Sequence, residues 1–174
     1  MTASAQKRAR EGSTLCCTQI DSPVGPLLLA GDDAGLREIR FVAGRRPQSP
    51  DPTWQPDAKP FAEAIRQLRS YFAGERKDFD LPLILEGTDF QLSVWHNLRK
   101  IPYGETISYL QLAEKIGNPK AVRAVGLANG ANPIPIIIPC HRVIGSNGSL
   151  TGFGGGLPAK QKLLALESSQ LSLL

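Results

Sequence analysis

The chain has 174 residues, of which 41% are hydrophobic and 21% charged. This length and composition are sufficient for the core of one ordinary domain or of two small ones. No stretch has the length of apolar sequence that a transmembrane helix needs, and the charged start, MTASAQKRAREGS, lacks the apolar segment of a signal peptide. We therefore expect a cytoplasmic protein with no membrane partner.

The net charge of +4 is unevenly distributed along the chain. Residues 1–88 hold 12 basic and 12 acidic side chains, whereas residues 89–174 hold 8 and 4. A basic surface is typical of proteins that bind a polyanion, although a surplus of this size also fits an ordinary solvated surface. The composition permits a nucleic-acid partner without requiring one.

The cysteine content indicates reduced thiols. There are three cysteines, and the adjacent Cys16 and Cys17 are poorly placed to bridge each other. The only imidazoles are His96 and His141, and no Cys-x-x-Cys spacing occurs. We expect neither a metal site nor a cofactor.

The first half has the pattern of a small α/β domain. The sequence TQIDSPVGPLLLA has two apolar runs around a Pro/Gly turn, and LREIRFV supplies a third run, so we expect a small antiparallel sheet. Four prolines among residues 44–58 predict a loop. A helix is predicted to begin at Pro60 and to end at Gly74.

The second half opens with strong helix signals. Thr88 and Gln91 form the pattern of a capping box, and so do Ser108 and Gln111, whose helix is expected to end at Gly117. The domain boundary is therefore predicted near residues 86–87.

A further helix is predicted to begin at Asn118, with Pro119 in its first turn, and to reach Gly130. Two short helices around a Gly-Asn-Pro turn are typical of a helix-turn-helix, although an ordinary helical hairpin has the same pattern. The second helix is rich in small residues and has Arg123 as its long polar side chain. These small residues, which suit close approach to a partner or tight internal packing, are Ala121, Ala124, Gly126, Ala128 and Gly130.

The most informative segment surrounds Cys140. An apolar run over residues 134–138 should be buried and should deliver Cys140 at a loop edge, followed by His141 and Arg142. Most buried cysteines are inert, but a neighbouring His and Arg are expected to lower the pKa of a thiol and make it nucleophilic. The base would need a carboxylate partner, and Glu167 is one of four acids after residue 88.

The string PCHRVIG at 139–145, with NP before it and GFGGG and LLALE after it, resembles the O6-alkylguanine-DNA alkyltransferases, also called methylated-DNA–protein-cysteine methyltransferases. The resemblance covers residues 87–167, including GTDFQLSVWHNLRKIPYGETISY and GNPKAVRAVG. It is weaker in the first half, in DSPVGPLLLA and YFAGE.

This resemblance implies two domains and a repair reaction. Residues 1–86 would form a ribonuclease-H-like α/β domain, and residues 87–174 a mainly α, winged-helix-like domain with a helix-turn-helix. The family binds double-stranded DNA through the minor groove, flips the damaged base out of the duplex and takes its alkyl group. We expect one irreversible turnover on O6-alkylguanine, and on O4-methylthymine, by a monomer.

The resemblance also implies residue roles. Cys140 would accept the alkyl group, His141 would act as its base through a water, and Glu167 would orient that His. Asn132 would brace the site, and Tyr109 would rotate the target phosphate and donate a proton towards the guanine. Arg123 would fill the gap left in the base stack. Further DNA contacts would come from Tyr109, Asn118, Ala121, Gly126 and Ser146, and the substrate pocket from Val143, Phe153 and Gly154, with the carbonyls of Cys140 and Val143 reading the exocyclic amine. Phe153 stands where many members have tyrosine, and Leu110 where some have a polar contact.

Three other functions stay open at this point. Some relatives lack the cysteine and only bind alkylated DNA, but this chain has Cys140. A cysteine hydrolase would need a second His facing the thiol, and only His96 is available. A transcriptional regulator would bind a specific operator, whereas we expect weak, salt-dependent binding that is largely independent of sequence.

Overall fold

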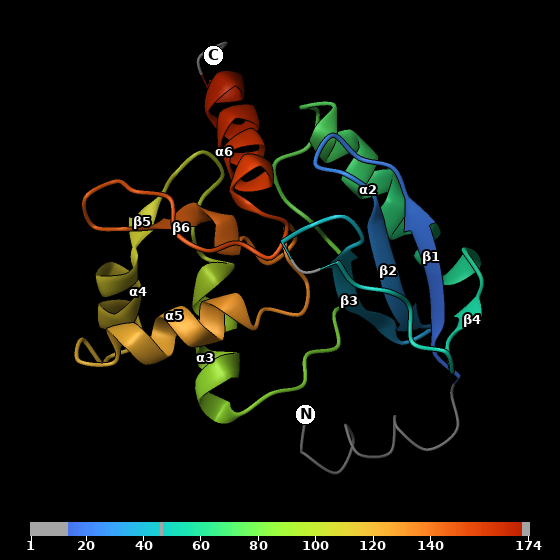
Figure 1. The fold of residues 1–174 in the computed structure, drawn as a ribbon, viewed down its shortest axis with the longest axis horizontal. Helices are drawn as coiled ribbons and strands as arrows, with labels where there is room; N and C mark the ends of the chain where they lie inside the picture. The colour runs from blue at the N-terminus through green and yellow to red at the C-terminus, as the bar shows by residue number, and fades with distance from the viewer. Residues whose placement is uncertain (1–13, 46, 172–174) are drawn as a thin grey trace.

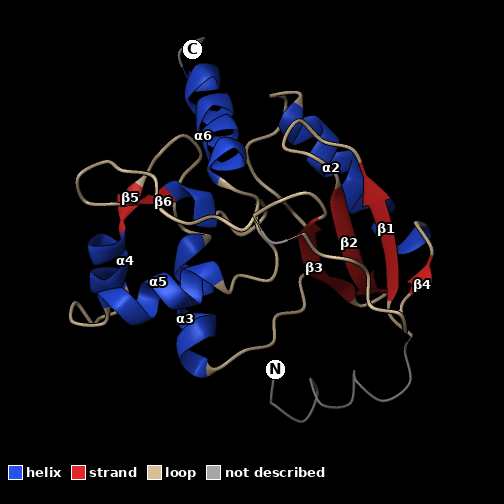
Figure 2. Cartoon of the chain, viewed as in Figure 1, coloured by secondary structure: helices blue, strands red, loops and turns tan. Residues whose placement is uncertain are grey.

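The computed structural model describes residues 14–45 and 47–171. Two parts lie side by side: a small sheet with its helix is formed by the first half of the chain, and a group of helices by the second half (Figures 1 and 2). This arrangement is the predicted α/β part followed by a mainly α part. Within the described residues, no helix is long and apolar enough to cross a membrane.

The sheet has four strands in the order β3-β2-β1-β4. Their bounds are β1 Cys16–Ile20, β2 Leu27–Asp32, β3 Gly35–Phe41 and β4 Gln55–Pro56. The predicted antiparallel pairing holds for β1, β2 and β3, but β4 pairs parallel to β1, so the sheet is mixed. The short β4 lies inside the predicted loop 44–58, where Trp54 packs on Leu28 and Ala30 and brings the chain back to the sheet.

One helix packs on the sheet and gives the first half its core. A 3₁₀ turn, η1 (Lys59–Phe61), leads into α2 (Ala62–Phe72), and Gly74 follows with a φ of 76°. Ala64, Leu68 and Tyr71 are buried at helical spacing along α2. The predicted helix from Pro60 to Gly74 is confirmed.

The second half contains the remaining elements. They are α3 (Asp89–Leu98), β5 (Ile107–Ser108), α4 (Tyr109–Lys115), α5 (Val122–Gly130), η2 (Cys140–Arg142), β6 (Val143–Ile144) and α6 (Leu157–Leu171). Both predicted capping boxes form, at the starts of α3 and α4, and α4 and α5 make the predicted helix-turn-helix.

The predicted start of α5 is wrong. The helix begins at Val122, and Asn118 does not cap it. The carbonyl of Asn118 instead accepts a hydrogen bond from the amide of Ala121 at 3.0 Å, which closes a turn over Pro119 and Lys120. The chain uses these residues to change direction between two packed helices, so the N-cap is Ala121, three residues later than the pattern predicted.

A parallel two-strand pair connects the helix-turn-helix to the cysteine segment. Ile107 pairs with Val143 and Ser108 with Ile144. Tyr109 follows β5 directly, and Cys140–Arg142 precede β6. The pairing therefore holds the start of α4 beside the segment that carries Cys140.

The two halves share one hydrophobic core. Buried residues of β2, β3 and α2 belong to the same cluster as those of α3, α4, α5 and α6. The amide of Ile39 on β3 also donates to the carbonyl of Pro133 at 2.9 Å. The boundary at residues 86–87 lies in the segment between α2 and α3 and stays a prediction.

Glycines at the end of the GFGGG string allow the two halves to approach closely. A Cβ added at Gly155 would lie 2.7 Å from two ring atoms of Phe41, and one added at Gly44 would lie 2.6 Å from the carbonyl oxygen of Gly154. Both distances are shorter than any normal contact. These positions have no room for a side chain.

We predict that Gly155→Ala destabilises the protein by roughly 1–3 kcal/mol, because the new methyl group must displace the Phe41 ring. Gly152→Ala in the same loop is the matched control. Its Cβ would meet only the Arg45 guanidinium at 3.9 Å, so the change should stay within about 0.5 kcal/mol. Denaturant unfolding measures both free energies, and equal values for the two variants would contradict the close packing.

Candidate active site

Cys140 lies at the end of a tightly folded loop. Asn132 fixes this loop: its Nδ2 donates to the carbonyl of Ile138 at 2.7 Å, and its Oδ1 accepts from the amide of Ile134 at 3.0 Å. Between them, Ile136 has a φ of 76°, a conformation that costs energy for a β-branched residue. Asn132 therefore sits where the bracing residue was expected.

His141 and Glu167 form a buried pair beside the cysteine. The Nε2 of His141 lies 2.8 Å from Oε1 of Glu167, and both side chains are at most 1% exposed. Arg142 donates its Nε to Oε2 at 2.9 Å and its Nη2 to Oε1 at 2.8 Å. Of the four candidate acids, Glu167 is thus the one that contacts the predicted base.

The electrostatics of the pair fix its protonation. Burial raises the pKa of the Glu167 carboxyl, but the hydrogen bonds and charges of His141 and Arg142 outweigh burial and lower it to about 2. Burial lowers the pKa of His141 despite the contact with Glu167. An ionised carboxylate has no proton to donate, so neutral His141 must carry its proton on Nε2. Its Nδ1 has no hydrogen-bond partner within the described residues and keeps a lone pair.

The thiol differs from the expectation. We expected His141 and Arg142 to lower the pKa of Cys140, but burial raises it, and the thiol is 6% exposed. The groups that partly oppose burial are the Asn132 side chain, the Lys160 charge and backbone amides. The Arg142 guanidinium is engaged with Glu167 and with the carbonyl of Ile101, at 2.6 Å.

Two site residues were missed by the sequence reasoning. Lys160 is fully buried, and its Nζ donates to the carbonyls of Val143 at 2.7 Å and Thr151 at 3.0 Å. Its position seven residues before Glu167 on one helix was the available signal. Tyr71 comes from α2 and donates its hydroxyl to Glu167 Oε1 at 2.8 Å, and no sequence signal connects these two residues.

The candidate pocket residues lie together around the cysteine segment. Val143 is fully buried directly after η2, and Phe153 is 7% exposed with its ring 5.2 Å from that of Phe41 in an edge-on contact. Gly154 is exposed next to Phe153. The loop that carries Phe153 is held to Lys160 through the carbonyl of Thr151.

The candidate DNA contacts occupy the outer part of the helix-turn-helix. Arg123, Asn118 and Ser146 are exposed, whereas Ala121 and Gly126 are half-buried. Tyr109 is half-buried at the start of α4, accepts a hydrogen bond from Thr151 Oγ1 at 3.0 Å and has its ring 3.9 Å from the Cβ position of Gly126. The parallel pairing of β5 and β6 brings the Tyr109 and Ser146 ends of this surface together.

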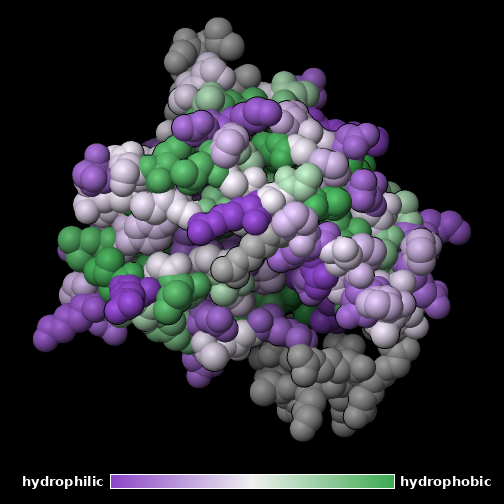
Figure 3. All heavy atoms as spheres, viewed as in Figure 1, coloured by the Kyte–Doolittle hydropathy of each residue, from purple (hydrophilic) through white to green (hydrophobic). Residues whose placement is uncertain are grey.

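One exposed apolar side chain on this surface was not predicted. Leu127 is 73% exposed on α5, one turn after Arg123, and Leu110 is 43% exposed on α4. Figure 3 shows hydrophobic spheres beside hydrophilic ones over this part of the molecule. Arg123 and Leu127 therefore share one exposed face of α5.

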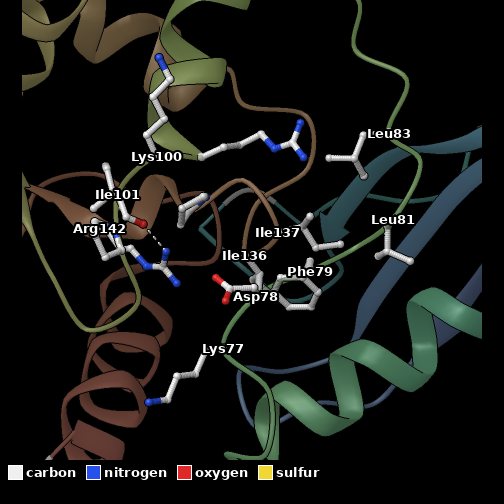
Figure 4. A pocket seen from close by; sticks show the side chains of 13 residues that line it. Lys77, Asp78, Phe79, Leu81, Leu83, Lys100, Ile101, Ile136, Ile137 and Arg142 are labelled. Carbon is white, nitrogen blue, oxygen red and sulfur yellow. Dashed lines mark hydrogen bonds between the residues drawn. The ribbon is translucent and has the colours of Figure 1, made fainter.

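A separate pocket of about 250 Å³ is also lined by Arg142. Its lining comes from the segment before α3, the end of α3 and the loop that leads to Cys140. The lining residues are Lys77, Asp78, Phe79, Leu81, Leu83, Arg99, Lys100, Ile101, Pro102, Ile136, Ile137, Pro139 and Arg142. Figure 4 shows Arg142 and Asp78 directed into this pocket, with the Ile101 carbonyl bonded to Arg142. The Arg142 guanidinium thus lines this pocket and also contacts the His141–Glu167 pair, which is called the relay below.

A cysteine hydrolase would need His96 to face the thiol, and the structure does not favour this. His96 is exposed on α3, whereas His141 is buried in its pair with Glu167. Over residues 14–45 and 47–171, no group of three His, Cys, Asp or Glu side chains is placed to hold a metal ion. The groups that do converge near Cys140 are a base, its carboxylate and two cations.

Comparison with known proteins assigns the chain to a family. Residues 15–85 match the family model described as 6-O-methylguanine DNA methyltransferase, ribonuclease-like domain, and residues 89–169 match its DNA binding domain. The chain belongs to the 6-O-methylguanine DNA methyltransferase family. The recognition made from PCHRVIG and the predicted two-part fold are confirmed.

Members of this family include close relatives of the chain. It is 56% identical over 149 residues to the methylated-DNA–protein-cysteine methyltransferase of Methanosarcina acetivorans, which covers 86% of this chain and 96% of the relative. The structure of Mycobacterium tuberculosis O6-methylguanine methyltransferase has a TM-score of 0.84 at 52% identity, covering 92% and 99% of the two chains. A structure of Mycobacterium tuberculosis OGT in complex with DNA has a TM-score of 0.83 at 52% identity, covering 91% and 94%.

The depressed pKa of Glu167 predicts how stability depends on pH. A carboxyl that titrates near 4.5 when unfolded and near 2 when folded stabilises the protein fully above pH 4.5, and this contribution is lost as the pH falls towards 2. Glu167→Gln should abolish this part of the pH dependence. It should also cost roughly 3–5 kcal/mol at neutral pH, because the Arg142 charge is left buried without its partner.

Chemical unfolding of both proteins at a series of pH values measures this. Glu114→Gln is the control, since Glu114 is exposed on α4 and its removal should matter little. A Glu167→Gln protein whose stability still falls steeply between about pH 4.5 and pH 2 would contradict the assignment.

Proposed function

We propose that this chain repairs alkylated DNA by moving the alkyl group of O6-alkylguanine, and of O4-methylthymine, to the Sγ of Cys140. The observation that carries the proposal is the buried His141–Glu167 pair next to Cys140, in a chain of this family. Relatives more than 50% identical are named methylated-DNA–protein-cysteine methyltransferase, and one related structure is a complex with DNA.

In the proposed step, the thiol proton moves through a water to Nδ1 of His141. The sulfur attacks the alkyl carbon, the bond from that carbon to O6 breaks, and its electron pair stays on the guanine. Glu167 then faces an imidazolium and stabilises its charge through the Nε2 proton. The product is a thioether, and since no group in the site reverses a carbon–sulfur bond, each chain reacts once.

Burial of the thiol gives His141 a specific task. Because burial raises its pKa, Cys140 rests as a neutral thiol and not as a free thiolate. His141, kept neutral by burial, has its Nδ1 lone pair ready to take the proton when the substrate arrives. The nucleophile is therefore generated during the reaction, which protects it from other electrophiles.

Departure of the guanine needs a proton donor and fixed carbonyls. Tyr109, placed beside the cysteine segment by the β5–β6 pair, is the proposed donor. The carbonyls of Cys140 and Val143 would accept from the exocyclic amine. The Val143 carbonyl already accepts from Lys160, but a carbonyl has a second lone pair for this contact.

The DNA would be bound through its minor groove by a monomer, and the protein would work in the cytoplasm. Arg123 would occupy the space of the flipped nucleotide, with Leu127 one turn away against the groove wall. Asn118, Ala121, Gly126 and Ser146 would contact the backbone. Phe153 and Gly154 would line the pocket for the flipped base.

The main alternative is a protein that only binds alkylated DNA. It would share the helix-turn-helix and Arg123 but would not need the His141–Glu167 pair. That pair can accept the proton that leaves the thiol, which favours the transfer reaction.

We predict that one alkyl group is transferred per chain from a duplex containing O6-methylguanine. Intact-protein mass should rise by one methyl group, and peptide mapping should place it on Cys140. Cys140→Ser should abolish the transfer and leave DNA affinity within a few fold, whereas Cys17→Ser should still react fully. Transfer by Cys140→Ser at the normal rate would exclude the mechanism.

We predict that Arg123→Ala slows the repair of duplex DNA by about tenfold or more, because the cost of unstacking a base is no longer offset. Reaction with a free O6-alkylguanine base, which needs no flipping, should be nearly unchanged. Lys120→Ala, which removes a charge from the neighbouring turn, should weaken binding of duplex in a salt-dependent way without this selective loss. Single-turnover rates on both substrates decide, and equal slowing on both would refute the assigned role.

A further inference from the structure

The first half of the chain contributes one polar atom to the relay. Tyr71 is fully buried on α2, and its hydroxyl donates to Oε1 of Glu167 at 2.8 Å, across 96 residues of sequence. Figure 1 shows α2 and α6, which carry the two residues, at the same end of the molecule. The part of the chain otherwise described as support thus contacts the carboxylate that holds the base.

The hydroxyl of Tyr71 can act here only as a donor. Burial, followed by the charge of Glu167, raises the pKa of Tyr71 far above its ordinary value, so the phenol stays protonated. Glu167 is ionised and can only accept. The hydrogen bond therefore has one direction as long as Glu167 is ionised.

Oε1 of Glu167 is shared by three donors. Tyr71 Oη, Arg142 Nη2 and His141 Nε2 all lie 2.8 Å from it, while Oε2 accepts from Arg142 Nε at 2.9 Å. Each donor draws negative charge from the same oxygen. The strength with which Glu167 stabilises a proton on His141 depends on how much charge the other two donors withdraw.

We propose that Tyr71 is a positioning residue that sets the basicity of His141 through Glu167. It rests on the proposed alkyl transfer. The hydroxyl, which comes from α2, orients the carboxylate through its hydrogen bond and limits how strongly the carboxylate holds the imidazolium. With this limit, His141 stays neutral at rest and accepts the thiol proton only during attack.

The other charged and titratable groups around the relay are accounted for. Arg142 and Lys160 disfavour a proton on His141, Cys140 is the proton source, and Tyr103 lies in the same aromatic cluster. Tyr103 is a close structural match to Tyr71: it is 8% exposed, its ring is 6.1 Å from that of Tyr71, and its hydroxyl has no hydrogen-bond partner within the described residues. It is a natural control.

The test compares Tyr71→Phe with Tyr103→Phe in the full chain. Single-turnover methyl transfer from a duplex containing O6-methylguanine is measured from about pH 5 to pH 9, the range in which an imidazole titrates. Without the Tyr71 hydroxyl, Glu167 holds the imidazolium more strongly. The acid limb of the plot of rate against pH should move to higher pH by up to about one unit, which corresponds to a tenfold change in the proton affinity of His141. Tyr103→Phe should leave the limb in place.

A second readout does not depend on activity. The chain has two histidines, and His96 is exposed, so the buried His141 can be followed by NMR. Its pKa should rise in Tyr71→Phe and stay constant in Tyr103→Phe. Site-specific Tyr71→3-fluorotyrosine keeps the ring and strengthens the donor, so it should shift His141 in the opposite direction, and it remains informative if Tyr71→Phe folds poorly.

Uniform slowing at every pH with an unchanged His141 pKa would overturn the proposal and leave Tyr71 a packing residue. Equal shifts in Tyr71→Phe and Tyr103→Phe would overturn it too, because the aromatic cluster and not the hydroxyl would then be responsible. Absence of transfer by the unmodified protein would refute the proposed function instead. The NMR comparison would still report whether Tyr71 controls His141.

Discussion

The carboxylate of Glu167 is the point on which the site depends. It is 1% exposed, and it accepts one hydrogen bond from His141, two from Arg142 and one from Tyr71. A charge at this depth is costly unless its lone pairs are satisfied, and here the donors come from α2 and η2 and include the Arg142 cation. The same contacts set the tautomer of His141 and orient the segment that carries Cys140. Stability and chemistry are therefore coupled in one side chain.

The features that the sequence predicted well are local ones. The capping boxes at Thr88 and Ser108 involve residues three positions apart, and both form as predicted. Features that depend on folding were only narrowed or were missed. Glu167 stayed one candidate among four acids, because its contact with His141 spans 26 residues and cannot be derived from local spacing. Tyr71 was missed, because a buried aromatic residue on a helix usually belongs to the core.

Two expectations failed for identifiable physical reasons. Asn118 and Pro119 fit the pattern of a helix start, but the chain needs those residues to turn between α4 and α5. The charge of Arg142 was expected to lower the pKa of the thiol, but burial of Cys140 raises that pKa, and the Arg142 guanidinium is paired with Glu167. In both cases the residue type was suited to the predicted role, and tertiary contacts assigned it another. The roles of Asn132 and Tyr109 came from the family resemblance and not from their sequence spacing.

The close packing of Phe41 on Gly155 limits how this architecture can be recombined. Two separate family models describe the two halves, which suggests parts that can be exchanged between relatives. The ring of Phe41 nevertheless occupies the volume that any side chain at position 155 would need. A chimera that joins the first half of one relative to the second half of another must match this ring and this glycine. This steric condition can be checked in the two sequences before such a fusion is made.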